Sequence, residues 1–297
     1  MKYLLCAVLV ASVAALALGE EPVLRYYHES VGIAEAARLK HAEQAMDFDG
    51  SRIVGGSTTG AGTHPFLIGL VITLTTGATS VCGSTMLSNT RSVTAAHCWW
   101  DGRNQARQFQ LVFGSNRLFS GGVRVNSNNV QMHGSWNHNN LNNDVAIITF
   151  QFVGYTNVIQ RAALATGSNN YAGSWGHAAG YGRTSDSNIF VYILPISLKL
   201  RRERIHVQLQ VITNAVCQQT FGNIIIASTL CTSGANGRST CGGDSGGPLT
   251  VGSGNPLYRH CPQIGITSFG SARGCSLGFP AAFARVTSFA SWINARL

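Results

Sequence analysis

The first strong feature of the hydropathy pattern is an apolar run near the start of the chain, followed by a polar stretch. Lys2 precedes the run, residues 3–18 are mostly apolar, and the run ends in the small residues Ala15 and Ala17. This order is typical of a secretory signal peptide, which we assign to residues 1–19. A membrane anchor is the alternative, but the run is shorter than the roughly 20 residues that span a bilayer. No later segment is long and apolar enough to cross a membrane, so we expect a secreted, extracellular protein.

The polar segment over residues 20–52 predicts a helix at roughly residues 29–45. It holds seven of the twelve acidic residues of the chain and no cysteine. It leads into "SRIVGG", where the bond between Arg52 and Ile53 suits a trypsin-like protease. We therefore expect residues 20–52 to be an activation propeptide that no disulfide would retain after cleavage.

Cleavage at this bond would create a new amino terminus at Ile53. Burying its ammonium group without a carboxylate partner would cost several kcal/mol. The candidate partners are the five acids that follow residue 52, namely Asp101, Asp144, Asp186, Glu203 and Asp244.

Beyond residue 52 the pattern and composition predict strands joined by many turns, in one large or two small domains. The chain has 34 glycines and only 11% charged residues. Residues 53–297 carry fifteen arginines and one lysine against five acids, a net charge of +11. Nucleic-acid binding is disfavoured, because the arginines are scattered and no basic motif with interleaved aromatics is present.

Seven cysteines follow the expected signal peptide. In an oxidising extracellular environment they predict three disulfides and one free thiol. Zinc binding is disfavoured, since the sequence has no Cys-x-x-Cys pair and no His-x-x-x-His set. The seven are Cys82, Cys98, Cys217, Cys231, Cys241, Cys261 and Cys275.

The stretch "RSTCGGDSGGPL", residues 238–249, is the strongest candidate for an active site. Its "GDSGG" fits the nucleophile elbow of α/β-hydrolases, but those enzymes need an acid and then a histidine after the serine. No Asp or Glu follows Ser245, so that order is excluded. The order His, Asp, Ser is available, because "TAAHC" contains His97 and "NNDVAIITF" places Asp144 before an apolar run that predicts a strand.

These motifs resemble those of one family. The stretches "RIVGG", "TAAHC", "DVAII", "NAVCQQTFGN", "GDSGGPL", "ITSFG" and "ARVTSFASWI" resemble the chymotrypsin-like serine endopeptidases, most closely the larval midgut chymotrypsins of moths and butterflies. The resemblance covers nearly all of residues 53–297, the expected peptidase domain. It implies an all-β fold of two antiparallel six-stranded β-barrels, with the active site between them and a C-terminal α-helix. The first barrel would span about 65–165, the second about 170–284 and the helix about 285–297.

The resemblance also implies a catalytic role for each motif. His97 would take the proton of the Ser245 hydroxyl as it attacks the peptide carbonyl, and Asp144 would orient and stabilise the imidazole. The N–H groups of Gly243 and Ser245 would form the oxyanion hole.

For activation, the resemblance pairs the Ile53 ammonium with Asp244 after a trypsin-like protease has cut behind Arg52. The intact chain is then a zymogen. A catalytically silent homologue with a binding role is the alternative. It is disfavoured, because such homologues generally lose a triad residue and this chain has all three.

The resemblance places the base of the primary specificity pocket at Ser239 and its walls at Gly270 and Ala281. A serine at the base leaves a substrate cation unpaired, so we expect cleavage after large apolar residues (Phe, Tyr, Leu, Met). An elastase-like pocket needs bulky walls, which Gly270 argues against and Ala281 favours only slightly. Ser268, Phe269 and Gly270 would form an edge strand that pairs with the substrate backbone.

The disulfides and two departures complete the comparison with the family. The implied disulfides are Cys82 with Cys98, Cys217 with Cys231, and Cys241 with Cys275. Cys261 matches no usual family cysteine and is expected to be a buried thiol or a site of intermolecular pairing. Residues 188–205, "NIFVYILPISLKLRRERI", replace a shorter loop; a loop insertion or an error in the gene model is favoured over a membrane or polyanion patch.

No metal, cofactor or N-linked glycan is expected. The family's calcium loop would lie within residues 115–131, which contain no carboxylate, and calcium usually requires acidic ligands. The chain has no Asn-x-Ser/Thr sequon. The expected partners are protein and peptide substrates, the activating protease and protein protease inhibitors, with no nucleic acid or membrane, and the enzyme is expected to be a monomer. Its near-absence of lysine suits an alkaline midgut lumen, because arginine keeps its charge at high pH.

Overall fold

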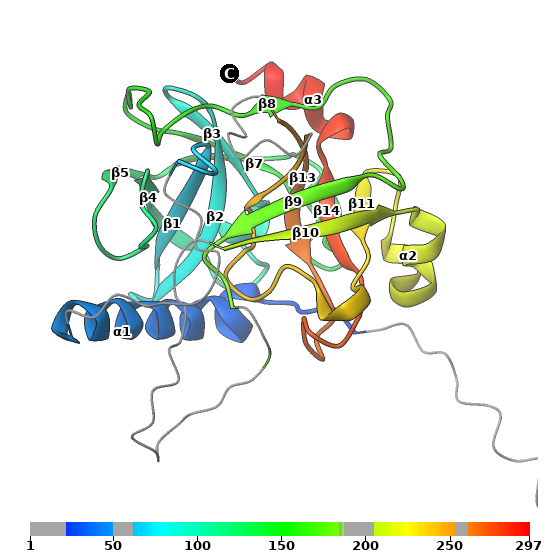
Figure 1. Cartoon of the computed structure of the whole chain (residues 1–297), viewed down its shortest axis with the longest axis horizontal. Coiled ribbons are helices and arrows are strands. Elements are labelled where there is room, and N and C mark those ends of the chain that lie inside the picture. The colour runs from blue at the N-terminus through cyan, green and yellow to red at the C-terminus, as the bar shows by residue number, and fades with distance from the viewer. Residues whose placement is uncertain (1–21, 50–61, 184–185, 187–204, 253–260) are drawn as a thin grey trace, which may run out of the picture.

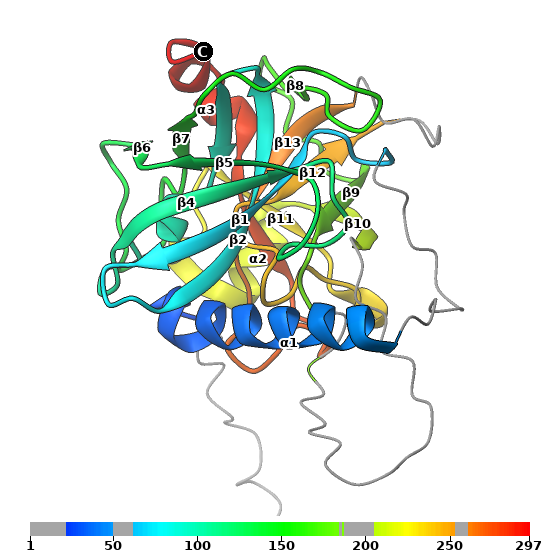
Figure 2. The same ribbon diagram turned by 90° about the vertical axis from the view of Figure 1, so that its left-hand side faces the viewer.

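Two β-sheets make up most of the molecule and lie side by side, with helices on the outside (Figures 1 and 2). The computed structural model describes residues 22–49, 62–183, 186, 205–252 and 261–297. The expected signal peptide, the cleavage site and nearly all of the 188–205 segment lie outside these residues.

The first sheet has the strand order β5-β4-β1-β2-β3-β7-β6, and all of its pairings are antiparallel. Its two end strands, β5 and β6, are separated in the chain by Asn128 alone, so the sheet curls back on itself. Its strands are β1 (Leu67–Leu74), β2 (Thr79–Ser88), β3 (Arg91–Thr94), β4 (Ala106–Phe113), β5 (Val123–Ser127), β6 (Asn129–Met132) and β7 (Ala146–Thr149).

The second sheet has the order β12-β9-β10-β11-β14-β13-β8, and β12 also pairs with β13. That extra ladder closes six strands into a barrel, while β8 (Ala163–Leu164) adds to β13 in parallel. The six are β9 (Trp175–Gly180), β10 (Ile205–Ile212), β11 (Thr229–Thr232), β12 (Pro248–Val251), β13 (Pro262–Phe269) and β14 (Ala281–Arg285).

The expected all-β fold of two barrels with a C-terminal helix is confirmed, with one correction. The second barrel is closed by a ladder, but the first is a half-barrel: in the described part of the chain no ladder joins β5 to β6. The physical reason is the break at Asn128, which leaves β5 paired with β4 and β6 paired with β7.

The strand β1 shows why these sequences form a buried sheet. Its sequence, LIGLVITL, is almost continuously apolar, as expected for a strand that is covered on both faces. Ile68, Leu70 and Ile72 belong to the main core, while Leu67 packs in a second apolar cluster with Ala36 and Leu39 of the N-terminal helix. The N-terminal helix therefore covers part of the outer face of this barrel.

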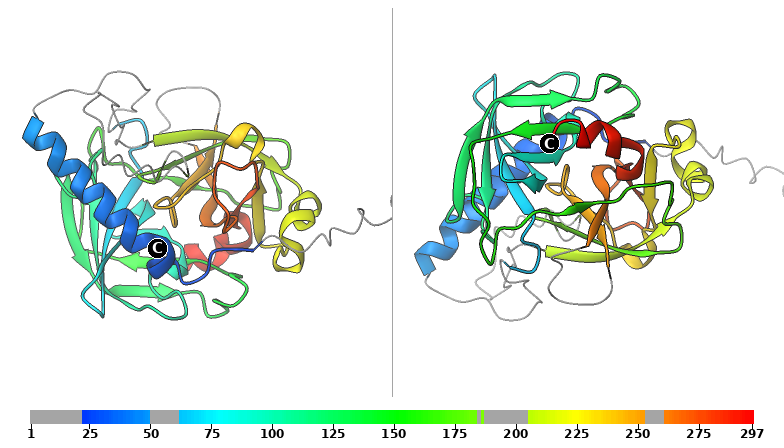
Figure 3. Two further views of the ribbon diagram at one scale, coloured as in Figure 1. Left: turned by 90° about the horizontal axis from the view of Figure 1, so that it is seen from below. Right: turned by 90° about the horizontal axis from the view of Figure 1, so that it is seen from above.

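That N-terminal segment forms one continuous helical rod. A π-helical turn, η1 (His28–Gly32), runs into α1 (Ile33–Asp49), close to the helix expected from the sequence. In Figure 1 the rod lies below the first sheet, at the lower ends of β1 and β2, and Figure 3 (left) shows that it crosses the underside of the molecule diagonally. Its N-terminal end lies near the junction of the two barrels.

Two helices pack on the second barrel. α2 (Asn214–Phe221) begins after Thr213, whose hydroxyl accepts a hydrogen bond from the Val216 N–H. α3 (Val286–Asn294) buries residues spaced by three and four positions, the pattern of a helix with one apolar face. Those residues are Val286, Phe289, Ala290 and Ile293. Three short 3₁₀ turns, η2 (Ala96–Cys98), η3 (Gly222–Ile224) and η4 (Ala235–Gly237), complete the described elements.

The structure pairs the cysteines as the resemblance implies. The bridges are Cys82–Cys98, Cys217–Cys231 and Cys241–Cys275. Cys261 carries a free, partly buried thiol, and burial raises its pKa above the ordinary value. Among the described residues, no helix combines the length and apolar character needed to cross a bilayer.

Candidate active site

His97 lies in η2, immediately before a disulfide-bonded cysteine. The 3₁₀ turn follows β3 of the first barrel, and the Cys82–Cys98 bridge ties it to β2. The imidazole is 3% exposed. The bridge and the tight turn together fix the backbone of the histidine.

Asp144 holds the imidazole in one orientation. It stands just before β7, and its carboxylate accepts two hydrogen bonds from the same residue: the His97 N–H at 2.9 Å and His97 Nδ1 at 2.7 Å. The Ser268 hydroxyl donates to the same carboxylate at 2.5 Å. Because a carboxylate only accepts, Nδ1 must carry the proton, which leaves the lone pair of the neutral ring on Nε2. Nε2 is buried and has no hydrogen-bond partner among the described residues.

Ser245 comes from the second barrel, in the loop that leads into β12. Its carbonyl accepts from the Gly83 N–H of β2 at 2.7 Å, which links the loop to the first barrel. Ser245 is 7% exposed and lines the same cavity as His97. The structure therefore brings together all three residues of the expected triad.

Gly243 lies in this loop in a conformation that requires glycine. Its φ is +99°, in the region that side chains disfavour, and a Cβ atom would lie 2.9 Å from the Gly182 Cα atom. The resemblance implied an oxyanion-hole role for the Gly243 N–H; the structure adds a steric reason for glycine at this position.

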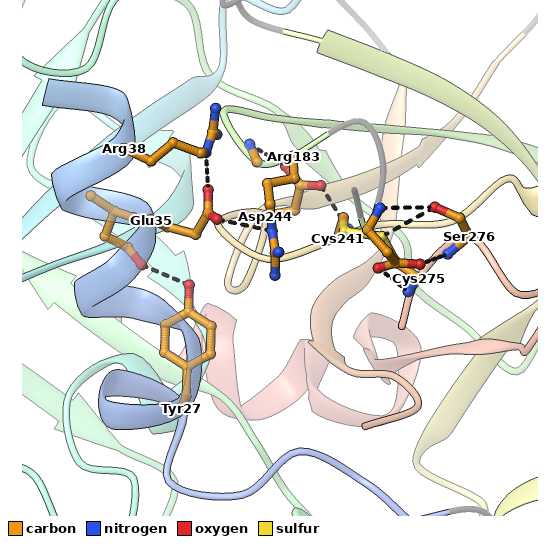
Figure 4. Close-up of polar contacts among 11 residues, drawn as sticks. Tyr27, Glu35, Arg38, Arg183, Cys241, Asp244, Cys275 and Ser276 are labelled. Atoms are coloured by element: carbon orange, nitrogen blue, oxygen red, sulfur yellow. Dashed lines mark hydrogen bonds and ion pairs between the residues drawn. A yellow bond between two sulfur atoms is a disulfide. The ribbon is translucent and has the colours of Figure 1, made fainter. Parts of the chain in front are cut away.

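Asp244 is partly buried and is absent from the residues that line the cavity; Figure 4 shows it next to Cys241. Its carboxylate accepts from the Gly182 N–H at 2.9 Å and from the Cys241 N–H at 3.0 Å. Burial raises its pKa to about 6, and nearby Glu35 adds to the rise, while the two N–H donors and Arg38 oppose it. The residue is a partly buried acid whose charge is not fully compensated by its described neighbours. Its expected partner, Ile53, and the cleavage residue Arg52 lie outside the described residues.

A cavity of about 300 Å³ lies between the barrels, next to Ser245 and His97. Ser239, Cys241, Gly270 and Cys275 are among the residues that line it. Around the position of a Cβ atom on Gly270 there is open space, in agreement with an open pocket mouth. Two further expected residues, Ser268 and Phe269 at the end of β13, also line the cavity.

Ala281 is placed differently from the expectation. It is 1% exposed at the start of β14 and is absent from the cavity lining, where Phe279 and Pro280 stand instead. The sequence reasoning took Ala281 as a wall residue by alignment with the family. In the structure its side chain belongs to the barrel core.

Asp186 contributes to the cavity wall, a role that the sequence did not reveal. Its carboxylate accepts from the Cys275 N–H at 2.8 Å and the Ser276 N–H at 2.6 Å. Burial opposes ionisation, but these backbone donors prevail and lower the pKa of Asp186 below its ordinary value. The acid therefore braces the loop that carries the Cys241–Cys275 bridge. The scarcity of acids after residue 52 was the available signal.

The N-terminal segment also lines the cavity, which was not expected. Leu24, Tyr26, Tyr27, Ser30 and Val31 form its outer side. The aromatic pair in a mostly polar segment was the available signal. These residues lie at least 66 positions from His97 in the chain, and no local pattern indicates the contact.

Two groups of possible metal ligands occur among the described residues. One contains Cys82, His97 and Cys98, and the other contains Asp186, Cys241 and Cys275. In both groups the sulfur atoms are consumed in disulfides and offer no thiolate. Neither group therefore provides a metal site with its full set of ligands.

Comparisons with known proteins agree with this geometry. The family model described as trypsin matches residues 53–293. The chain is 33% identical to a collagenase of Hypoderma lineatum, over 89% of this chain and 95% of that protein. It is 33% identical to alkaline trypsin C of Manduca sexta, over 85% of this chain and 94% of that protein.

A solved structure provides the matching fold. HL collagenase aligns with a TM-score of 0.69 and 32% sequence identity, covering 82% of this chain and 98% of that one. With the buried His97–Asp144 pair beside Ser245 and the match over residues 53–293, the chain belongs to the trypsin family of serine proteases.

Proposed function

We propose that the chain is the secreted zymogen of a serine endopeptidase that cleaves after large apolar residues. The observation that carries this proposal is the arrangement of His97, Asp144 and Ser245 beside a cavity that contains Ser239. The trypsin-family membership gives the reaction class, and the cavity gives the substrate preference.

The chemistry follows from the roles of the three side chains. His97 Nε2 takes the proton of the Ser245 hydroxyl as its oxygen attacks the scissile carbonyl, and the resulting imidazolium returns that proton to the leaving amine. Asp144 keeps Nδ1 protonated and stabilises the imidazolium. The N–H groups of Gly243 and Ser245 stabilise the oxyanion. Water then hydrolyses the acyl-enzyme by the same route and restores Ser245.

The substrate preference follows from charge. A substrate Arg or Lys that entered the cavity would meet a serine hydroxyl at Ser239, which cannot neutralise it, and an unpaired buried charge costs several kcal/mol. Asp101 and Asp186 are the acids of the cavity lining, but each already accepts hydrogen bonds from backbone N–H groups. Apolar side chains carry no such penalty, so the cavity favours Phe, Tyr, Leu and Met.

The proposed activation depends on Asp244, the partly buried acid next to Ser245 in the chain. A trypsin-like protease cuts after Arg52, and the freed Ile53 ammonium pairs with Asp244. The raised pKa of Asp244 supports this step, because a buried carboxylate gains most from a cation that arrives beside it. Residues 1–19 direct secretion, and the enzyme acts as a monomer on proteins and peptides in a gut lumen, where protein inhibitors regulate it.

The test is an assay of substrate preference. The full chain is first cut with trypsin, and the trypsin is then inhibited before the assay. The Ser245→Ala chain, treated in the same way, is the inactive control. Peptides that differ only in Phe, Leu, Ala or Arg before the scissile bond are compared by kcat/KM. We expect Phe and Leu to exceed Arg by about a thousandfold, the equivalent of roughly 4 kcal/mol.

A Ser239→Asp variant provides the matched change in specificity. A carboxylate at the base pairs with a substrate cation, so the variant should gain activity on the Arg peptide and lose activity on the Phe peptide. Preferential cleavage after Arg by the unmodified enzyme would contradict the proposed preference. Equal rates for the cut chain and its Ser245→Ala control would contradict the endopeptidase itself.

A further inference from the structure

The propeptide segment 22–49 lies across the active-site cleft and makes ordered contacts along its length. At its start, Val23 forms an antiparallel bridge with Ser271, and the Ala272 N–H donates to the Pro22 carbonyl at 2.8 Å. These contacts continue the edge that leaves β13. The segment thus begins on the second barrel, at the rim of the cavity.

Tyr27 covers the catalytic histidine. Its ring centroid lies 4.8 Å from that of His97, and its hydroxyl donates to the Val81 carbonyl at 2.8 Å. The phenolic oxygen also faces the Ser245 hydroxyl and the Gly243 N–H; burial raises the pKa of Tyr27, and these two groups oppose the rise. A phenol group therefore stands beside the catalytic histidine, nucleophile and expected oxyanion donor.

The next turn interlocks with β2 and the loop after η2. The His28 N–H donates to Asp101 Oδ2 at 2.9 Å, and His28 Nδ1 lies 2.8 Å from the Ser80 hydroxyl oxygen. Gly32 packs so closely that a Cβ atom there would collide with the same hydroxyl. His28 is completely buried. The close packing of His28 and Gly32 therefore depends on the identity of these two residues.

Glu43 anchors the far end of the segment, well away from the cleft. It is 3% exposed, and its carboxylate accepts from the Leu118 N–H at 2.6 Å, the Phe119 N–H at 3.0 Å and the Ser120 hydroxyl at 3.0 Å. Such charge-assisted hydrogen bonds are stronger than neutral ones. Glu43 therefore fixes the helix to the loop between β4 and β5.

Glu35 makes a further polar connection, near the middle of the segment. It pairs with Arg38 of its own helix at 2.8 Å and with Arg183 of the second barrel at 2.9 Å (Figure 4). Ala36 and Leu39 lie in one apolar cluster with Leu67 and Val81. The segment therefore binds both barrels through polar and apolar contacts.

We propose that residues 22–49 are a folded ligand of the cleft, which stays bound after cleavage at Arg52 and competes with substrate until it dissociates. This inference rests on the proposed function, which supplies the cleavage and the substrate. Every contact described above is made to the barrels by a residue within 22–49, so none depends on the bond that is cut. A side chain, Tyr27, faces His97, which explains how the segment occupies the site without presenting a scissile carbonyl there.

The first test measures retention of the cut segment without any catalysis. The full chain carries Ser245→Ala, and residues 49–51 are replaced by the recognition sequence of a site-specific protease that cuts after Arg52. Size-exclusion chromatography and mass spectrometry of the cut protein should show the propeptide eluting with the peptidase domain. Separate elution at micromolar concentration would overturn the inference.

The second test uses a synthetic peptide of residues 20–52, labelled with a fluorophore, and the same cut protein after its own propeptide has been dissociated and removed. We expect saturable binding by fluorescence anisotropy, weakened about 10-fold or more by Glu43→Gln in the peptide, because three hydrogen bonds to a buried charge are weakened. Glu29→Gln is the matched control, since Glu29 is exposed and pairs with exposed Arg103. Equal affinities of the two variant peptides would overturn the proposed binding mode. Changing the peptide leaves the folding of the peptidase domain unaffected.

The third test measures inhibition by the peptide at nanomolar concentrations of the activated enzyme. The peptide should raise KM for a small substrate and leave kcat unchanged, and Tyr27→Ala in the peptide should weaken the effect. Inhibition that lowers kcat alone would contradict competition at the cleft. If the cut unmodified chain proves inactive while the cut Ser245→Ala chain retains its propeptide, only the proposed function is refuted. An active enzyme that releases its propeptide at once would refute only this inference.

Discussion

The two aspartates of the active-site region, Asp144 and Asp244, differ in their hydrogen bonds, which give them different tasks. Asp144 accepts from the backbone and side chain of His97 and from Ser268, so its carboxylate orients a ring. Asp244 accepts from two backbone N–H groups, and burial still raises its pKa to about 6. A raised pKa means that ionisation of Asp244 costs stability in the intact chain.

This cost predicts a specific pH dependence for the intact chain. A carboxyl with a raised folded-state pKa binds its proton more tightly when folded, so stability falls as pH rises from about 4 to about 6 and is then constant. Between pH 4 and pH 7 the free energy of unfolding should fall by about 2 kcal/mol more in the Ser245→Ala chain than in the same chain with Asp244→Asn. Denaturant unfolding at pH 4 and pH 7 measures this difference.

Asp186→Asn is the control for this experiment. The pKa of Asp186 is lowered, so its titration lies below the same pH window and its removal should leave the pH dependence there unchanged. If the unfolding free energy of the Asp244→Asn chain depends on pH as strongly as that of the parent chain, the assignment of the raised pKa to Asp244 is contradicted.

At this scale the sequence revealed the residues whose chemistry is local and missed those whose role comes from distant contacts. His97, Asp144 and Ser245 stand in recognisable motifs, and the structure brings them together. Tyr27 and Glu43 gain their roles from residues 54 and about 75 positions away, and no spacing rule encodes such contacts. Ala281 was expected as a wall of the specificity pocket, but it is buried in the core, and that placement depends on packing.

Among the elements, α1 could be predicted as a helix from sequence, but its docking position could not. Its buried residues, Glu35, Ala36, Leu39, Ala42 and Glu43, form a mixed polar and apolar face. A surface helix with a clear apolar stripe would have indicated burial. Here two buried acids and small side chains determine the fit, and both depend on the shape of the partner.

The π-helical turn before α1 predicts that acid weakens the docking of the released propeptide. Burial lowers the pKa of His28 to about 4; Asp101 and the Cys98 backbone oppose this shift, and His97 adds to it. Because the free peptide regains an ordinary histidine pKa, docking is strongest above about pH 6.5 and is lost progressively down to about pH 4. We expect an affinity about 30-fold lower at pH 5 than at pH 7.5.

Anisotropy with the labelled peptide of residues 20–52 and the cut Ser245→Ala protein measures this effect. In a His28→Asn peptide the affinity should be lower at neutral pH but nearly independent of pH over the same range. His41→Asn is the matched control, since His41 is exposed on α1. If the His28→Asn peptide and the parent peptide lose affinity in parallel on acidification, another group is responsible.

For the whole molecule, the architecture could be predicted through the family resemblance, while the state of the active site could not. Two barrels and a C-terminal helix follow from motifs that recur across the family, although the break at Asn128 leaves the first barrel without a closing ladder. The resemblance describes the mature domain. It therefore gave no account of a propeptide lying across the cleft, since that segment precedes the matching stretches.

The charges of the two parts predict how the released propeptide associates with the peptidase domain. Residues 20–52 carry seven acids against three arginines and one lysine, while residues 53–297 carry a net charge of +11. Opposite net charges speed diffusional encounter, and salt screens this attraction, since the Debye length falls from about 30 Å at 0.01 M to about 3 Å at 1 M salt. The docked contacts of Tyr27, His28 and Glu43 are buried and are screened much less.

Stopped-flow binding of the labelled peptide should therefore show an association rate that falls about 10-fold or more across this range of salt concentration. The dissociation rate should change by less than about threefold. A dissociation rate that carried most of the salt dependence would mean that exposed ion pairs such as Glu29 with Arg103, and not the buried anchors, hold the segment in the cleft.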